Sequence, residues 1–248
     1  MHQYILYQAY GSSGHVNECR YSLLKYLEHY NLNPPVDIGI IIYTDQPAFF
    51  ESLSTFFHSF EMKEVSQNQI NEWKGSDNFT HRAKIAIIKE FFENTEGDLL
   101  YFDTDTYITQ PVEPVFENMT KGYFYMHEYE GELNTSVNPE FHKWVKFLAT
   151  NKIEFNNKEV IFSNKLKMWN AGVLGIPGKY KYLLDDILAL TDSVYSKFQK
   201  HIAEQFAFSY CLQNEGTIKS SEDSIVHYWN LKEFRHILKL FFKKNEEE

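Results

Sequence analysis

The sequence is short of cysteine, of basic residues and of long apolar runs, and each shortage excludes a class of protein. It holds two cysteines, Cys19 and Cys211, too few for a disulfide framework, and neither stands in a C-x-x-C zinc spacing. Lysine and arginine number 24 against 34 acidic residues, and the net charge of -10 argues against a nucleic-acid partner. No apolar run reaches the roughly 18 residues of a transmembrane helix, and the start of the chain lacks the basic region of a secretory signal. These absences predict a cytoplasmic protein without a transmembrane segment.

Apolar and aromatic side chains are abundant by contrast. Hydrophobic residues make up 43% and aromatic residues 17% of the 248 positions, which predicts a well-packed globular protein. The segment 234–242 near the end of the chain is amphipathic, and two lysines follow it. This segment predicts a surface helix, and peripheral contact with a membrane surface is the alternative.

Strand-like and helix-like segments alternate through the first 109 residues, as they do in βαβ units. The alternation predicts an α/β fold with a parallel or mixed sheet, and the length is compatible with one domain over residues 1–248. We expect Thr80 to be the N-cap of the helix that precedes the most apolar strand. The expected strands are 3–9, 37–43, 62–65, 98–102, 123–128 and 172–176, and the expected helices are 17–30, 47–60, 80–94, 140–149, 182–198 and 202–213.

Two carboxylates, Asp103 and Asp105, follow the apolar strand 98–102. Successive strand side chains point to opposite faces, so the two aspartates are expected on one face, where like charges need a countercharge. A divalent cation supplies it, because Mn2+ and Mg2+ take oxygen ligands and commonly lie between protein carboxylates and substrate phosphates. The pair therefore predicts a metal site that takes a diphosphate, and a solvated turn is the alternative.

Several separated segments carry a resemblance to a known family. Their order is similar to that of the GT-A fold glycosyltransferases, and it looks closest to the glycogenin and lipopolysaccharide galactosyltransferase type. The resemblance covers the chain from about residue 3 to residue 235, and it implies a Rossmann-like, mostly parallel mixed sheet flanked by helices. It also implies a nucleotide-binding half over residues 1–109 and an acceptor-binding, metal-completing half over residues 110–248. The segments are Arg82, the D-x-D segment 101–105, Asn170-Ala171-Gly172, Glu204-Gln205 and Val226-His227-Tyr228-Trp229.

The resemblance implies a reaction and a ligand set. The donor would be a nucleotide-diphosphate sugar, with uridine as the favoured base, and the acceptor a hydroxyl such as that of a cell-surface glycan precursor. Mn2+ or Mg2+ would be held by both motif aspartates and His227, for which a structural histidine is the alternative. Arg82 would fix the carboxylates or the diphosphate, because a guanidinium pairs with either group. Lys232 stands where relatives carry a diphosphate-binding lysine, and Arg235 is the possible substitute.

The loop after the first strand is where the resemblance would place the nucleoside. Tyr10 offers a ring for stacking on the base, and Gly11 lets the backbone approach a ligand closely. Asp45 follows the second strand and would border the same pocket, although a turn aspartate is an equal alternative.

Glu204 and Gln205 are the candidates for the catalytic step. The pair is a candidate for either of two roles, a general base for inversion or a group behind the anomeric carbon for retention. Relatives that retain configuration carry Asp-Gln at this place, so the pair favours retention. Glu204 differs from the aspartate of those relatives by one additional methylene. Asn170 would hydrogen-bond the donor sugar, and Trp169 and Trp229 are candidates for stacking on sugar faces, with burial in the core as the alternative.

Three other functions fit parts of the pattern. A phosphatase of the haloacid dehalogenase type also uses two strand-end aspartates with Mg2+, but Tyr107 replaces the residue its motif requires. A module that binds nucleotide sugar or glycan without turnover would be expected to lack a motif carboxylate, and both are present. A nucleotidyltransferase would carry basic residues in its first loop, and residues 11–14 have none.

Overall fold

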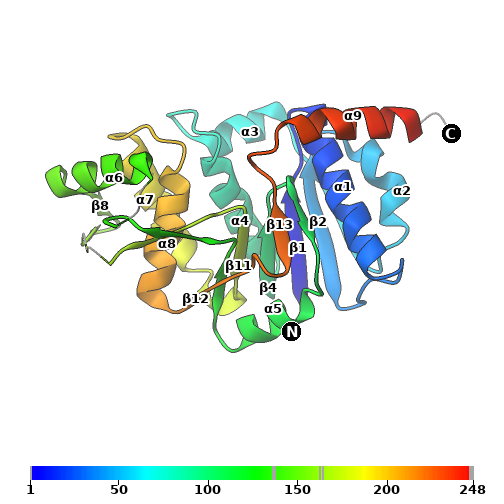
Figure 1. The fold of residues 1–248 in the computed structure, drawn as a ribbon, viewed down its shortest axis with the longest axis horizontal. Helices are drawn as coiled ribbons and strands as arrows, with labels where there is room; N and C mark the ends of the chain where they lie inside the picture. Colours follow the sequence, from blue (N-terminus) through cyan, green and yellow to red (C-terminus); the bar gives the residue numbers. More distant parts are fainter. Residues whose placement is uncertain (1, 136–137, 162, 164, 246–248) are drawn as a thin grey trace.

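The computed structural model describes residues 2–135, 138–161, 163 and 165–245, and it has a central sheet with helices on both faces (Figure 1). Within this part of the chain the sheet has seven strands, in the order β12-β6-β11-β4-β1-β2-β3. β11 runs antiparallel to both of its neighbours, and the other pairs are parallel. The predicted mixed, mostly parallel sheet is therefore confirmed. The strands are β1 (Gln3–Gln8), β2 (Ile38–Thr44), β3 (Phe60–Glu64), β4 (Asp98–Phe102), β6 (Phe124–Met126), β11 (Val173–Ile176) and β12 (Ile218–Ser220).

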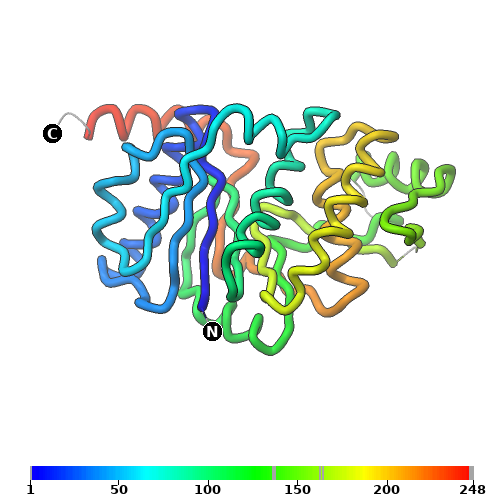
Figure 2. Tube along the Cα trace, turned by 180° about the vertical axis from the view of Figure 1, so that it is seen from behind, coloured from blue at the N-terminus to red at the C-terminus, as the bar shows by residue number. Residues whose placement is uncertain are grey.

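Different helices cover the two faces of the sheet because strand side chains alternate. Along β1, Ile5 and Tyr7 share a core with α1 and α5, whereas Leu6 shares a core with α4, α6, α7 and α8. α1 lies in front of the sheet in Figure 1, and α4 lies in front of it in the view from behind in Figure 2. The helices are α1 (Ser13–His29), α2 (Glu51–Ser54), α3 (Gln67–Lys74), α4 (Arg82–Asn94), α5 (Glu113–Thr120), α6 (Pro139–Thr150), α7 (Leu183–Tyr195), α8 (Ala203–Glu215) and α9 (Glu233–Asn245), with single 3-10 turns η1 (Pro47–Phe50) and η2 (Gly178–Tyr180).

Short ladders outside the central sheet join segments that are far apart in the sequence. β5 (Thr106–Ile108), which follows β4, pairs antiparallel with β13 (Ile225–His227). β7 (Tyr129–Glu132) pairs with β10 (Lys167–Trp169), and β8 (Glu154–Phe155) pairs with β9 (Lys158–Glu159). The β5–β13 and β7–β10 ladders bring residues from later in the chain to the carboxyl end of β4.

Two local expectations were wrong. The expected helix 47–60 is only η1 followed by the four-residue α2, and β3 begins at Phe60. The Ser54 and Thr55 hydroxyls donate to carbonyls three residues earlier, and such local bonds compete with continuation of a helix. α4 begins at Arg82, and no side chain caps it, so Thr80 is not the N-cap. The patterns also missed α3, although Ser66 and Gln69 form a capping box at its start.

The predicted C-terminal surface helix is confirmed as α9. Leu238 and Phe242 are its buried side chains, and the Phe234 ring lies edge-on to the Tyr21 ring of α1 at 5.2 Å between centroids. Over the described residues, no helix has both the length and the apolar character needed to cross a bilayer.

Candidate metal centre and adjoining cavities

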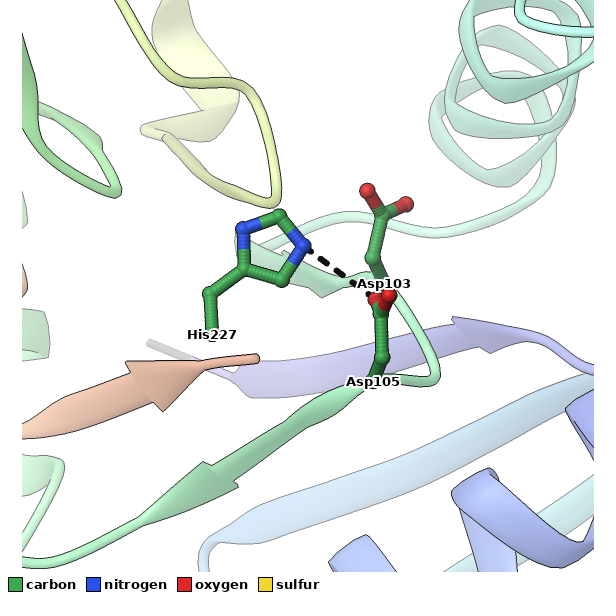
Figure 3. A group of neighbouring side chains, drawn as sticks. All are labelled: Asp103, Asp105 and His227. Carbon is green, nitrogen blue, oxygen red and sulfur yellow. Dashed lines mark hydrogen bonds and ion pairs between the residues drawn. The ribbon is translucent and has the colours of Figure 1, made fainter. Parts of the chain in front are cut away.

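The turn after β4 and the end of β13 bring two aspartates and a histidine together (Figure 3). β13 pairs with β5 so that His227 lies opposite Thr106, and the Tyr228 N–H donates to the Asp105 carbonyl over 3.0 Å. Ligand atoms of Asp103, Asp105 and His227 all lie within 4.8 Å of one another. The three residues that the sequence nominates as metal ligands thus form one cluster beside the carboxyl end of β4.

The aspartates lie in a turn, contrary to the expectation that they share one strand face. β4 ends at Phe102 and β5 begins at Thr106, so Asp103 and Asp105 stand between the two strands. The Asp103 N–H donates to the Gly172 carbonyl over 2.8 Å, and the Thr106 hydroxyl donates to the Asp103 carbonyl over 2.8 Å. These bonds fix the turn that brings the two carboxylates together.

The orientation of His227 follows from its hydrogen bond to Asn170. The Asn170 Oδ1 accepts the Gly172 N–H over 2.9 Å, and its Nδ2 donates to the Glu130 carboxylate over 3.0 Å. The oxygen of this amide therefore faces His227, so Nδ1 is the protonated ring nitrogen that donates to it over 3.0 Å. Nε2 lies 3.2 Å from the Asp105 Oδ1. A proton or a cation must lie between these two atoms: with a proton on Nε2, His227 is charged and donates to Asp105, and with a metal ion both atoms become ligands.

His127 supports the ring of His227 from the side. The two ring centroids lie 5.2 Å apart at an angle of 85°. Burial, followed by the charge of His227, lowers the pKa of His127 to about 4. His127 is therefore neutral near pH 7, and its Nε2–H donates to the Ile225 carbonyl over 3.1 Å. The contact with the His127 ring therefore restricts rotation of the His227 side chain.

Lys84 of α4 is the buried countercharge of the site. Its Nζ lies 3.1 Å from an Asp103 carboxylate oxygen and 3.0 Å from the Glu204 Oε1, and it donates to the Ala171 carbonyl over 2.9 Å. Burial alone would lower the pKa of Lys84, but the charges of Asp103 and Glu204 outweigh it and raise the pKa. Lys84 is therefore a permanent cation that ties the metal cluster to α8.

A second ion pair joins the cluster to α9. The Arg235 Nε donates to the Glu18 Oε1 over 2.6 Å, and its guanidinium lies 3.7 Å from the Asp105 Oδ2. Burial acts to raise the pKa of Asp105, but the hydrogen bond and charge of His227 and the charge of Arg235 outweigh it and lower the pKa. Burial raises the pKa of Glu18 in spite of its pairing with Arg235. Arg235 thus provides positive charge beside the turn.

Two cavities meet at the cluster. The larger, of about 340 Å³, extends toward α8 and the β7–β10 ladder, and the smaller, of about 190 Å³, extends toward β1 and α9. Asp103, Asp105, Lys84 and His81 line both of them. A ligand that occupied both cavities would therefore pass directly over the carboxylates.

The larger cavity contains the three residues nominated for the sugar. Asn170, Glu204 and Gln205 all line it. The Gln205 Nε2 donates to the Glu130 Oε2 over 2.7 Å, so Glu130 holds the amides of both Asn170 and Gln205. Glu204 is buried and paired with Lys84. The exposed ring of Trp229 lies at the same cavity, whereas Trp169 is half-buried against the core.

In the loop after β1, Gly11 is hydrogen-bonded to Asp45, whereas the Tyr10 side chain is buried. The Gly11 N–H donates to the Asp45 Oδ2 over 3.1 Å, and the φ of +83° at Gly11 is one that favours glycine. The Tyr10 ring packs against Trp73 with 6.2 Å between centroids, and only 7% of the residue is exposed. The structure thus places Tyr10 in the core, where little of its ring is open to stacking.

Arg82 and Lys232 do not meet the metal cluster. The Arg82 guanidinium donates to both oxygens of Asp192, over 2.7 and 3.1 Å, and to the Trp73 carbonyl over 2.8 Å. Arg82 therefore fixes α4 to α7, and the contact to the motif carboxylate that it was expected to make belongs to Lys84. Lys232 is exposed in the loop before α9, and the basic residue that reaches the cluster is Arg235.

Sequence reasoning missed Lys84, Glu18 and Glu130. A signal for Lys84 exists, because it shares helical spacing with Ile88 and Phe91 and so falls on the apolar side of α4. No comparable signal marks Glu130, which reaches the site through the β7–β10 ladder, or Glu18, which meets Arg235 through the docking of α9.

Gly172 is close-packed against His227, and this contact gives a testable prediction. A Cβ at residue 172 would lie 2.2 Å from the ring atoms Cε1 and Nδ1 of His227. Gly172→Ala is therefore expected to displace His227 and weaken Mn2+ binding about ten-fold or more, as measured by titration calorimetry. Gly14→Ala is the matched control, since its Cβ would meet Ser12 at an ordinary 3.5 Å. Equal Mn2+ affinity in the two variants would contradict the assignment of His227.

Comparison with known proteins finds solved structures with a similar fold. No protein-family model matches the sequence, and no curated protein matches it. Mouse xyloside xylosyltransferase 1 in its apo form is similar with a TM-score of 0.54 at 10% identity, covering 89% of this chain and 85% of that chain. The glycosyltransferase GlyE of Streptococcus pneumoniae TIGR4 is similar with a TM-score of 0.52 at 12% identity, covering 88% of this chain and 45% of that chain. This chain thus spans under half of the GlyE chain, and the likenesses show that it has the fold of known glycosyltransferases.

Proposed function

We propose that this protein is a metal-dependent glycosyltransferase that transfers a sugar from a nucleotide-diphosphate sugar, with a UDP-sugar favoured, to a hydroxyl of a glycan acceptor. One observation carries the proposal: Asp103, Asp105 and His227 gather between two cavities beside the carboxyl end of β4, in a fold shared with glycosyltransferases. Ligands of open α/β sheets bind outside the carboxyl ends of the strands, so the position and the ligand chemistry agree.

The donor atoms of the cluster favour Mn2+ over Mg2+. Two carboxylates suit either ion, but a neutral imidazole nitrogen is a better ligand for the transition metal. Asn170 accepts a hydrogen bond from the Nδ1–H of His227, which leaves Nε2 as the nitrogen that can bind the metal. The bound ion would neutralise negative charge on the diphosphate as the glycosidic bond breaks.

We assign the smaller cavity to the nucleoside diphosphate and the larger one to the sugar and the acceptor. Arg235 lines the smaller cavity, and its guanidinium suits a phosphate, so it takes the role that the sequence suggested for Lys232. Gly11 and Asp45 follow the neighbouring strands β1 and β2 and border the nucleoside end. In the larger cavity, the Asn170 and Gln205 amides are held by Glu130 and face the donor sugar.

The environment of Glu204 favours retention of configuration. A general base needs an accessible oxygen, whereas Glu204 is buried and held 3.0 Å from the Lys84 ammonium. We therefore assign Glu204 to positioning Lys84 and assign Gln205 to the side of the anomeric carbon away from the diphosphate. A leaving diphosphate oxygen would then take the proton of the acceptor hydroxyl, and the product would keep the donor configuration.

Release of nucleoside diphosphate from a panel of UDP-, GDP- and ADP-sugars, with Mn2+, Mg2+ or EDTA, tests the proposal. We expect slow hydrolysis of a UDP-sugar with Mn2+, a lower rate with Mg2+ and none with EDTA, because the cluster supplies three of the metal ligands. Turnover of a phosphate ester with Mg2+ but of no nucleotide sugar would favour a phosphatase. Nucleotide-sugar binding without release, across a panel of glycan acceptors, would favour a non-catalytic module.

A further inference from the structure

The outward face of α9 exposes large apolar side chains in a regular row. Ile237, Leu240 and Phe241 are 57%, 56% and 47% exposed, and their spacing of three and four residues places them on one side of the helix. Leu238 and Phe242 lie on an adjoining side and are buried. Helix α9 therefore buries one apolar face and presents a second apolar face to solvent.

Basic residues accompany this apolar row in an otherwise acidic chain. Except for Glu233, every charged residue of α9 is basic, although the whole chain has a net charge of -10. Arg235 points inward to Glu18, whereas Lys239, Lys243 and Lys244 are exposed. An exposed apolar row beside lysines is the pattern of a helix that lies in the headgroup region of an anionic bilayer.

The exposed face of α9 lies at the edge of the molecule that carries the cavities. Figure 1 shows α9 along the edge opposite the N-terminus, and β1 runs from the N-terminal edge toward it. Arg235 of α9 lines the smaller cavity, and Trp229, in the loop before α9, lines the larger one with 56% of its surface exposed. A surface held against α9 would therefore lie beside both cavities.

We propose that the outward face of α9 docks this protein on an anionic lipid bilayer. Ile237, Leu240 and Phe241 enter the headgroup region, and the three exposed lysines contact anionic headgroups. A symmetric dimer through the same face would bring the lysines of two copies together, so charge complementarity favours lipid over a second copy. The sequence continues with three glutamates at 246–248, outside the described residues, and the experiment therefore tests the lysines directly.

Co-sedimentation of the full chain with vesicles measures this docking without any enzymatic readout. A negative result would therefore contradict the docking proposal and leave the proposed glycosyltransferase function untouched. We expect binding to vesicles of phosphatidylcholine with phosphatidylglycerol, weak binding to phosphatidylcholine alone, and release by salt. Replacing Ile237, Leu240 and Phe241 with serine is expected to reduce binding about ten-fold or more, and replacing Lys239, Lys243 and Lys244 with glutamine is expected to remove the preference for anionic lipid.

A control variant replaces Val36 and Ile161 with serine, since these are exposed apolar residues outside α9, at 71% and 77%. It is expected to bind vesicles as the wild type does, and thermal unfolding of every variant checks the fold. Undiminished vesicle binding by the serine variant of α9 would overturn the proposal. So would the absence of vesicle binding together with a dimer, seen by analytical ultracentrifugation, that the same variant dissociates.

Discussion

Asp105→Asn is expected to abolish Mn2+ binding at this site while the protein stays folded. Asp105 offers its carboxylate within 4.8 Å of the other two ligand atoms, and its Oδ1 lies 3.2 Å from the His227 Nε2. An amide has nearly the same shape but carries no charge, so the loss should fall on the ion rather than on packing. We expect Mn2+ affinity to fall about 100-fold or more, and nucleoside diphosphate release to fall below detection.

Titration calorimetry and thermal unfolding with and without Mn2+ measure this effect. A ligand that binds only the folded state raises the unfolding temperature, so Mn2+ should stabilise the wild type and leave Asp105→Asn unchanged. Asp77→Asn is the matched control, because Asp77 is an exposed aspartate that lies outside the cluster. If Asp105→Asn binds Mn2+ as tightly as Asp77→Asn does, the metal site lies elsewhere.

The sheet and the two aspartates could be predicted from the sequence because each had a local sign. Continuous apolar runs mark β2 and β4 as buried parallel strands, and the aspartates of the cluster follow β4 directly. His227 could be nominated only by its place in the order of motifs. What brings it to Asp105 is the ladder between β13 and β5, and a pairing between such short, distant strands leaves no periodicity to detect.

The structure places Lys84 rather than Arg82 beside Asp103, and Arg235 rather than Lys232 beside Asp105. The sequence held a local sign of the first difference but none of the second. Residues 82 and 84 lie on different sides of a helix, so only one of them can face the end of β4. Lys84 is in phase with the buried Ile88 and Phe91, and a lysine on an apolar face needs a buried partner. For the other pair, the first turn of α9 decides that Arg235 points inward, and its Glu18 partner comes from a helix far away in the sequence.

Lys84→Met is expected to destabilise the fold by about 3–5 kcal/mol, because it removes a buried cation and leaves carboxylates without a countercharge. Lys84 is 4% exposed, and Glu204, which it pairs with over 3.0 Å, is 3% exposed. Methionine has a similar length and is apolar, so the cost arises mainly from the buried charge of Glu204. The free energy of unfolding in urea, compared with that of the wild type, measures the effect.

A second substitution separates charge from packing. Glu204→Gln in the Lys84→Met background removes the stranded charge, and the double variant is expected to recover roughly half of the loss or more. Lys89→Met is the matched control on the same helix, because Lys89 pairs with Asp185 where both side chains are exposed, and it should cost below about 1 kcal/mol. If Lys84→Met costs no more than Lys89→Met, or if the double variant is less stable than Lys84→Met alone, Lys84 is not the countercharge of this site. The double variant also allows a test of function, because it is expected to fold although it has lost both charges. Nucleoside diphosphate release by this variant measures whether Glu204 does more than hold Lys84.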